Sequence, residues 1–142
     1  MGVTVDLFGE CEQPAIKESQ LQISLVKILQ RMLRPDVLMR HIPAGGMDAR
    51  TGAKLKMMGR MAGCADLEFM WVDAHGFLRV LFLELKLPGR TLTSSQEHFK
   101  RRVRPLGPYY VATTINEALE TLRTYDLLQN ASISTALLPK VA

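Results

Sequence analysis

The sequence predicts a single α/β domain in which helices flank a mixed central β-sheet. Three observations predict this fold class. The 142 residues are about the length of one domain. The composition, 47% hydrophobic and 23% charged, is ordinary for a globular protein. Segments with helical periodicity alternate with short apolar segments typical of strands, in the order αβ(α)ββαβα, where the parentheses mark a short helix.

The N-terminal half of the chain is expected to hold two helices and one strand. Residues 14–33 are predicted as a long helix, because a proline suits the first turn and apolar residues recur at intervals of three and four. Residues 37–42 are predicted as a short strand and 43–52 as a glycine-rich loop. A short basic helix over 53–61 follows, and Gly63 is expected to end it.

The C-terminal half is expected to begin with a β-hairpin. Residues 65–72 and 77–86 are the strongest strand predictions, since both are rich in apolar and aromatic residues and the turn sequence AHG separates them. Another strand is expected over 109–113. Helices are predicted over 93–104 and 114–128, and each opens with a capping pattern.

The chain is therefore divided into a loose N-terminal arm over 1–13, one domain over 14–128 and a C-terminal tail over 129–142. No apolar run reaches the roughly 20 residues that span a bilayer, and the N-terminus lacks the basic start and apolar block of a secretory signal. Cys11 and Cys64 are too few for a disulfide framework or a zinc cage, which favours a reducing compartment. We expect a cytoplasmic protein with no membrane segment.

Basic side chains are concentrated in two windows of the sequence. Residues 31–60 and 86–104 together hold thirteen Lys and Arg against three Asp and Glu, whereas the rest of the chain holds five against eleven. Segregation of this kind indicates a surface that binds a polyanion. The alternative is that the windows are the solvated faces of two helices.

The segment FLRVLFLELK carries two charges at the end of an otherwise apolar strand. Alternation of side chains places Phe82, Glu84 and Lys86 on one face of that strand. Burying a carboxylate or an ammonium group without a partner costs several kcal/mol. Either Glu84 and Lys86 form a salt bridge with each other, or they belong to a functional site.

The hairpin brings a second carboxylate to the same end of the strand. If Gly76 is left-handed in a three-residue loop, Asp73 pairs with Phe77, and Asp66 then lies opposite Glu84. Two carboxylates directly across a ladder repel each other. A divalent cation between them would turn that repulsion into affinity, and carboxylate oxygens suit Mg²⁺ or Mn²⁺.

The order of these residues resembles the PD-(D/E)xK nuclease superfamily, and most closely its VRR-NUC branch of phage and bacterial nucleases. The matching motifs are GCAD at 63–66, ELK at 84–86 and Gln96 in the following helix. Further matches are HIPAGG at 41–46, the basic stretch KLKMMG at 54–59 and a glutamate on the first helix. The resemblance covers residues from about 16 to about 120, and it departs from the family at Ala65, where a proline often precedes the aspartate.

The resemblance implies a restriction-endonuclease-like core and a metal-dependent endonuclease. Asp66 and Glu84 would hold a catalytic Mg²⁺ or Mn²⁺, with the backbone carbonyl of Leu85 as a further ligand. Glu18 on the first helix would complete the acidic site and could bind a second metal. The alternative for Glu18 is an exposed first-turn acid favoured by the helix dipole. Glu68, on the same face as Asp66, could substitute for it or point to solvent.

The same resemblance gives catalytic roles to two further side chains. Lys86 would position or activate the attacking water and offset the charge that develops on the phosphate. Gln96 would orient Lys86 or contact the substrate, and the alternative is that it only completes a capping box with Thr93. Met57 and Met58, within the basic stretch, and Met61 just after it are expected to pack against the protein rather than bind a metal.

The two basic windows would grip DNA phosphates on either side of a cleft. The residues expected to bind DNA are Arg50, Lys54, Lys56, Lys100, Arg101 and Arg102. No sequence-reading motif is present, so we expect recognition of DNA structure. Stand-alone VRR-NUC proteins resemble dimeric resolvases, which implies a homodimer acting on branched DNA such as a Holliday junction, in a bacterial or phage-infected cell. The alternatives are a non-catalytic DNA-binding protein of the same fold, and a nuclease subunit active only within a larger restriction or repair assembly.

Overall fold

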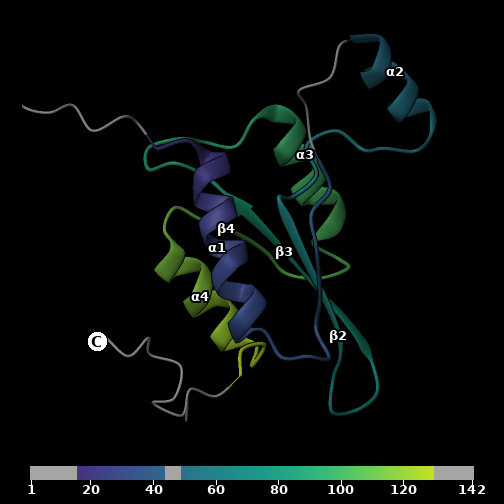
Figure 1. The fold of residues 1–142 in the computed structure, drawn as a ribbon. Helices are drawn as coiled ribbons and strands as arrows, with labels where there is room; N and C mark the ends of the chain where they lie inside the picture. The colour runs from purple at the N-terminus through teal and green to yellow at the C-terminus, as the bar shows by residue number, and fades with distance from the viewer. Residues whose placement is uncertain (1–15, 44–48, 130–142) are drawn as a thin grey trace, which may run out of the picture.

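The computed structural model describes residues 16–43 and 49–129 (Figure 1). The predicted arm over 1–13, half of the predicted glycine-rich loop (44–48) and the tail from residue 130 lie outside the described residues. The elements in the described part are α1 (Glu18–Met32), β1 (Leu38–Arg40), α2 (Ala49–Met57), β2 (Leu67–Val72), β3 (Leu78–Leu85), α3 (Ser94–Val103), β4 (Tyr109–Ala112) and α4 (Ile115–Thr124). This order is the predicted αβ(α)ββαβα. No helix in the described ranges is long and apolar enough to cross a membrane.

The sheet is mixed, as predicted. Its strand order is β1-β2-β3-β4, with the first two pairs antiparallel and β3 parallel to β4. The hairpin has the predicted register: Leu67 pairs with Leu83, Gly76 has φ of 84°, and the Asp73 N–H donates to the Phe77 carbonyl at 2.9 Å. The left-handed glycine fixes the turn, and the turn fixes every pair along the ladder.

The two faces of the sheet are covered by different helices. Odd-numbered residues of β2 and β3 pack with α1 and α4 in the main core, where Leu25, Leu29, Phe69 and Leu83 are fully buried. The even-numbered face carries α3, whose Phe99 packs edge-on against Phe82 with ring centroids 5.7 Å apart. Because both faces are covered there, the second half of β3, from Leu81 to Leu85, is buried, whereas Leu78 at the start of the strand is exposed.

The predicted boundaries of α2 were wrong by four residues at each end. The helix spans Ala49–Met57 rather than 53–61, and Gly59, not Gly63, ends it. Gly59 has φ of 97°, and its N–H donates to the Lys56 carbonyl at 3.0 Å, while the Arg60 N–H donates to the Leu55 carbonyl at 2.9 Å. This pair of bonds is a Schellman C-cap, which reverses the chain directly after the helix.

Two other helices are shorter than predicted. α1 begins at Glu18, since Ile16 and Lys17 are not helical. α4 ends at Thr124 rather than 128, because the chain turns at Asp126, with φ of 56°, to bury Leu127 and Leu128 in the core. The prediction for β1 was longer than the strand, and the remaining strand and helix predictions differ from the structure by at most two residues at each end.

Candidate active site

Three ionisable side chains meet at the end of the sheet opposite the hairpin turn. Asp66 directly precedes β2, Glu84 lies in β3, and Lys86 follows that strand. Glu84 is 2% exposed and Lys86 7% exposed. The Lys86 N–H donates to the Ala112 carbonyl at 3.0 Å, which extends the parallel pairing of β3 with β4 and fixes the backbone at this end. Buried charges at a strand end require partners.

Glu84 has a partner for one of its two oxygens. Its Oε1 accepts a hydrogen bond from Gln96 Nε2 at 2.6 Å, whereas Oε2 is buried and has no hydrogen-bond partner. Burial, and after it the neighbouring Asp66 carboxylate, raise the pKa of Glu84 to about 8 against the opposing effect of Lys86. At neutral pH and without a bound cation, this carboxyl group therefore keeps its proton.

Asp66 shares this electrostatic environment. Its Oδ2 accepts a hydrogen bond from the Leu85 N–H at 2.8 Å across the start of the hairpin. Burial raises the pKa of Asp66, the Leu85 N–H lowers it, and the Glu18 carboxylate raises it. Both acids thus ionise less readily than usual, because the positive charge near them does not compensate their burial.

Lys86 is paired with α1 rather than with its neighbour on the strand. Lys86 Nζ lies 3.8 Å from Glu18 Oε1, and the same oxygen lies 3.5 Å from the Leu87 nitrogen. The salt bridge between Glu84 and Lys86 that was one alternative is not among the ion pairs of the described residues. Glu18 is half-buried at the site, so it is more than an exposed first-turn acid.

Gln96 completes the predicted capping box and also reaches the acidic site, where its partner is Glu84 and not Lys86. Its side-chain amide oxygen accepts from the backbone N–H of Thr93 at 2.9 Å, and its backbone N–H donates to Thr93 Oγ1 at 3.3 Å. These two bonds complete the predicted capping box. Its amide nitrogen donates to Glu84. The predicted contact with Lys86 is not among its hydrogen bonds, and the structure places the amide on the acid instead.

Gly63, in the GCAD motif, lets the chain before Asp66 pack closely against the start of α3, which carries Gln96. Its φ is 73°, and a Cβ at this position would lie 2.4 Å from the carbonyl carbon of Ser95 and 2.6 Å from the Gln96 nitrogen. The backbone before Asp66 and the first turn of α3 therefore touch directly, which only glycine allows.

Glu68 does not point to solvent. It is buried, and its Oε2 accepts from Arg40 Nε at 2.7 Å across the β1–β2 pair. A bound arginine neutralises this carboxylate, so Glu68 is a structural ion pair beside the site.

Two residues at the site were missed by the sequence reasoning. His41 Nδ1 contacts the Asp66 carbonyl oxygen at 2.6 Å and Gln22 Nε2 at 2.9 Å. The Tyr109 hydroxyl is buried without a hydrogen-bond partner, and burial, followed by the Glu84 and Asp66 carboxylates, raises the pKa of Tyr109. His41 could have been found from its place in the HIPAGG motif, whereas Tyr109 reaches the site only through the parallel pairing of β4.

The donor chemistry at this strand end fits a hard divalent cation in part. Within residues 16–43 and 49–129, no three His, Cys, Asp or Glu side chains form a group that could hold a metal. The two carboxylates Asp66 and Glu84 are nonetheless adjacent, and the unpartnered Glu84 Oε2 is a buried acceptor of the kind that Mg²⁺ and Mn²⁺ prefer. The Leu85 carbonyl and Glu18 stay predictions as further ligands.

The residues predicted to bind DNA lie on two helices. Arg50, Lys54 and Lys56 are exposed on α2, and Arg101 and Arg102 are exposed on α3, where Lys100 is half-buried. Figure 1 shows α2 standing away from the sheet on the side of α3. Of these two helices, α3 contacts the acidic site directly, through the hydrogen bond from Gln96 to Glu84.

The fold of this chain is similar to that of a solved structure. No family model and no curated protein matches the chain. A solved structure described as a VRR_NUC domain protein superposes with a TM-score of 0.61 at 20% sequence identity, over 80% of this chain and 91% of that chain. This chain has the VRR-NUC fold. The predicted restriction-endonuclease-like architecture is confirmed at the level of the fold.

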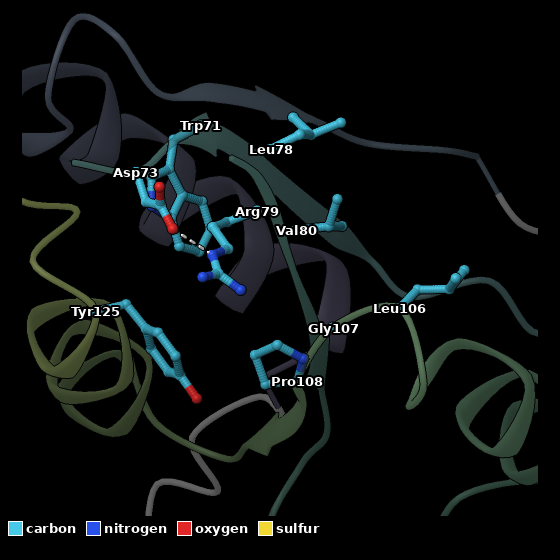
Figure 2. A pocket seen from close by; sticks show the side chains of 9 residues that line it. All are labelled: Trp71, Asp73, Leu78, Arg79, Val80, Leu106, Gly107, Pro108 and Tyr125. Carbon is cyan, nitrogen blue, oxygen red and sulfur yellow. Dashed lines mark hydrogen bonds and ion pairs between the residues drawn. The ribbon is translucent and has the colours of Figure 1, made fainter. Parts of the chain in front are cut away.

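The VRR-NUC fold of this protein also contains a cavity of about 330 Å³ at the hairpin end of the sheet (Figure 2). Trp71, Leu78, Val80 and Tyr125 are among its lining residues, and Arg79 contacts Asp73 there at 2.6 Å. The cavity lies at the opposite end of β2 and β3 from the acids. It is therefore separate from the candidate active site.

Proposed function

We propose that the protein is a Mg²⁺- or Mn²⁺-dependent nuclease that hydrolyses phosphodiester bonds in DNA. The observation that carries the proposal is the pair formed by Glu84 and Asp66: one oxygen of Glu84 is buried without a partner, and both acids have a raised pKa. A stable core has no use for two such acids beside a buried lysine. A cation would relieve their repulsion, and DNA would bring its phosphate to them.

Each side chain has a role in this proposal. Asp66 and Glu84 would hold the metal, and Gln96 would keep the Glu84 carboxylate aimed at it. The bound cation would stabilise charge on the phosphate and make water a better nucleophile. Lys86, which lies 3.8 Å from Glu18, would exchange that partner for the phosphate or for the attacking water.

The DNA substrate is proposed from charge and from the resemblance. The basic side chains of α2 and α3 would bind phosphates without reading the sequence. A preference for branched DNA, including Holliday junctions, and action as a homodimer are part of the proposal, because symmetric cleavage of a junction requires two sites related by a two-fold axis.

The test is cleavage of linear duplex, single-stranded, flap and four-way-junction DNA with Mn²⁺ or with EDTA. Asp66→Asn, Glu84→Gln and Lys86→Met should each lower the cleavage rate by at least roughly a hundredfold, since each removes a group from the reacting centre. Asp73→Asn, at the other end of the same hairpin, is the matched control and should cleave as the wild type does.

The outcome separates the rival functions. DNA binding without turnover in Mn²⁺ would favour a non-catalytic binder. Turnover that requires a cell extract would favour a subunit of a larger assembly. Cleavage by the Asp66 and Glu84 variants at the wild-type rate would remove these acids from the mechanism.

A further inference from the structure

We infer that Met57 and Met58, at the tip of α2, form an apolar wedge that enters the base stack of bound DNA. The inference rests on the DNA-binding part of the proposed function and names the residues that would select a distorted duplex. It does not depend on the cleavage chemistry.

The two methionines are unusually exposed. Met57 is 89% exposed and Met58 73% exposed, so the prediction of packing was wrong for these two, whereas Met61 packs against the core around Phe82 and Phe99 as predicted. Single apolar side chains on a surface are common and need no explanation. Here two long, flexible ones are adjacent at the end of a helix that itself stands away from the sheet (Figure 1).

The backbone holds this tip in place. The Met58 N–H donates to the Lys54 carbonyl at 3.0 Å, so Met58 still belongs to the last helical turn. The Schellman bonds of Gly59 and Arg60 then reverse the chain immediately after it. The two side chains therefore project from a fixed apex, where the backbone loses little conformational freedom on binding.

The charge around the tip selects a polyanion as its partner. Helical spacing of three and four residues places Met57 on the same stripe as Arg50 and Lys54. No acidic residue occurs from Ala49 to Ala65, whereas four basic residues do. Proteins that bend DNA combine basic contacts to the backbone with apolar side chains, methionine included, inserted between base steps. A partner protein with a purely apolar surface would not complement the positive charge around the tip.

The position of α2 in the chain brings the wedge to the acidic site. The helix is inserted between the end of β1 and the start of β2, which is the end of the sheet that holds Asp66. Seven residues lie between Met58 and Asp66, so the Cα atoms of the two are about 28 Å apart along the chain at most. A base step opened by the tip would thus lie within about one helical turn of duplex from the phosphate at the acids.

This arrangement gives a physical basis for structure selectivity. Opening a stacked base step has a free-energy cost of a few kcal/mol. At a branch point or nick the bases are already unstacked, so the wedge enters without that cost. The wedge would therefore favour branched DNA over a continuous duplex even though no side chain reads the sequence.

The experiment uses the full-length protein and DNA that contains 2-aminopurine at successive positions, in EDTA so that no strand is cut. Wild-type protein should raise the fluorescence at one or two positions, which reports unstacking. The double variant Met57→Gln, Met58→Gln keeps the side-chain length and the helix and should abolish the rise. Its affinity for a four-way junction relative to duplex should fall by on the order of tenfold.

The matched control is Leu106→Gln, because Leu106 is also 73% exposed but lies beside the hairpin-end cavity. This variant should unstack DNA as the wild type does. Equal fluorescence with wild type and the methionine variant would overturn the wedge, as would unchanged junction preference. Methionine-dependent binding to vesicles of anionic lipid, with no change in 2-aminopurine fluorescence, would assign the tip to a membrane instead.

The two proposals fail in different ways. Wild-type protein that cleaves DNA in Mn²⁺ but never unstacks it would retain the nuclease and refute the wedge. Protein that unstacks DNA but shows no turnover would retain the wedge and refute the nuclease.

Discussion

Replacing Glu84 by glutamine tests the electrostatics of the acidic site directly. The pKa of Glu84 is raised from 4.5 to about 8, so the folded protein keeps a proton that the unfolded chain releases between these values. Stability contributed by the protonated group is fully present below pH 4.5 and is lost as the pH rises to about 8. The loss is about 3 kcal/mol at pH 7 and about 5 kcal/mol above pH 8.

Glutamine mimics the protonated acid and does not titrate, and its amide oxygen can still accept from Gln96. We therefore expect Glu84→Gln to match the wild type near pH 4.5 in EDTA and to exceed its free energy of unfolding by about 3 kcal/mol at pH 7. Urea denaturation at half-unit pH steps measures the difference. Added Mn²⁺ should stabilise the wild type increasingly toward pH 8, because the cation displaces the proton, and should do little for the variant.

Asp73→Asn provides a comparison of opposite sign. The Phe77 N–H, and after it the Arg79 guanidinium, holds the pKa of Asp73 below its usual value. Its contribution to stability is present at neutral pH and is lost as the pH falls, so this variant should be less stable than the wild type at pH 7. If the Glu84→Gln and wild-type stability curves run parallel in EDTA from pH 4.5 to about 8.5, the raised pKa is wrong and the metal argument loses its basis.

Two further predictions concern α3 and α2. Gly63→Ala should lower the free energy of unfolding by more than Gly76→Ala does. Both glycines have positive φ, but only Gly63 has backbone atoms within 3 Å of the added Cβ. Chemical denaturation measures both losses, and equal losses would show that α3 shifts to accept the Cβ at no cost. Replacing Lys54 and Lys56 by alanine should make the slope of log affinity for DNA against log salt shallower by about 0.9 for each phosphate that the variant no longer neutralises. An unchanged slope would place the DNA elsewhere.

The hairpin was predictable because its information is local. A left-handed Gly76 fixes the turn, and alternation along each strand then assigns Asp66 and Glu84 to one face and one end. The capping pattern at Thr93 fixed the start of α3 for the same reason. These features required only neighbouring residues, so a single sequence contained them.

The partners of the buried charges were not predictable from one sequence. Lys86 binds Glu18 from α1, and Glu68 binds Arg40 from β1, contacts that depend on how the helix and the edge strand pack on the sheet. The end of α2 was predicted wrongly because Gly59 and Gly63 could each end the helix, and the sequence does not distinguish them. Only Gly59 makes the Schellman hydrogen bonds. Because the helix ends at Met57 and does not continue to residue 61, Met57 lies at the tip of α2, where it is exposed.

The single amide of residue 96 has two duties at once: its oxygen secures the beginning of a helix, and its nitrogen secures an acid on the neighbouring sheet. Asparagine, one methylene shorter, could satisfy one end only. A substitution at this position would therefore weaken the start of α3 and misorient the Glu84 carboxyl group at the same time. The stability of the helix and the geometry of the acid thus depend on one side chain.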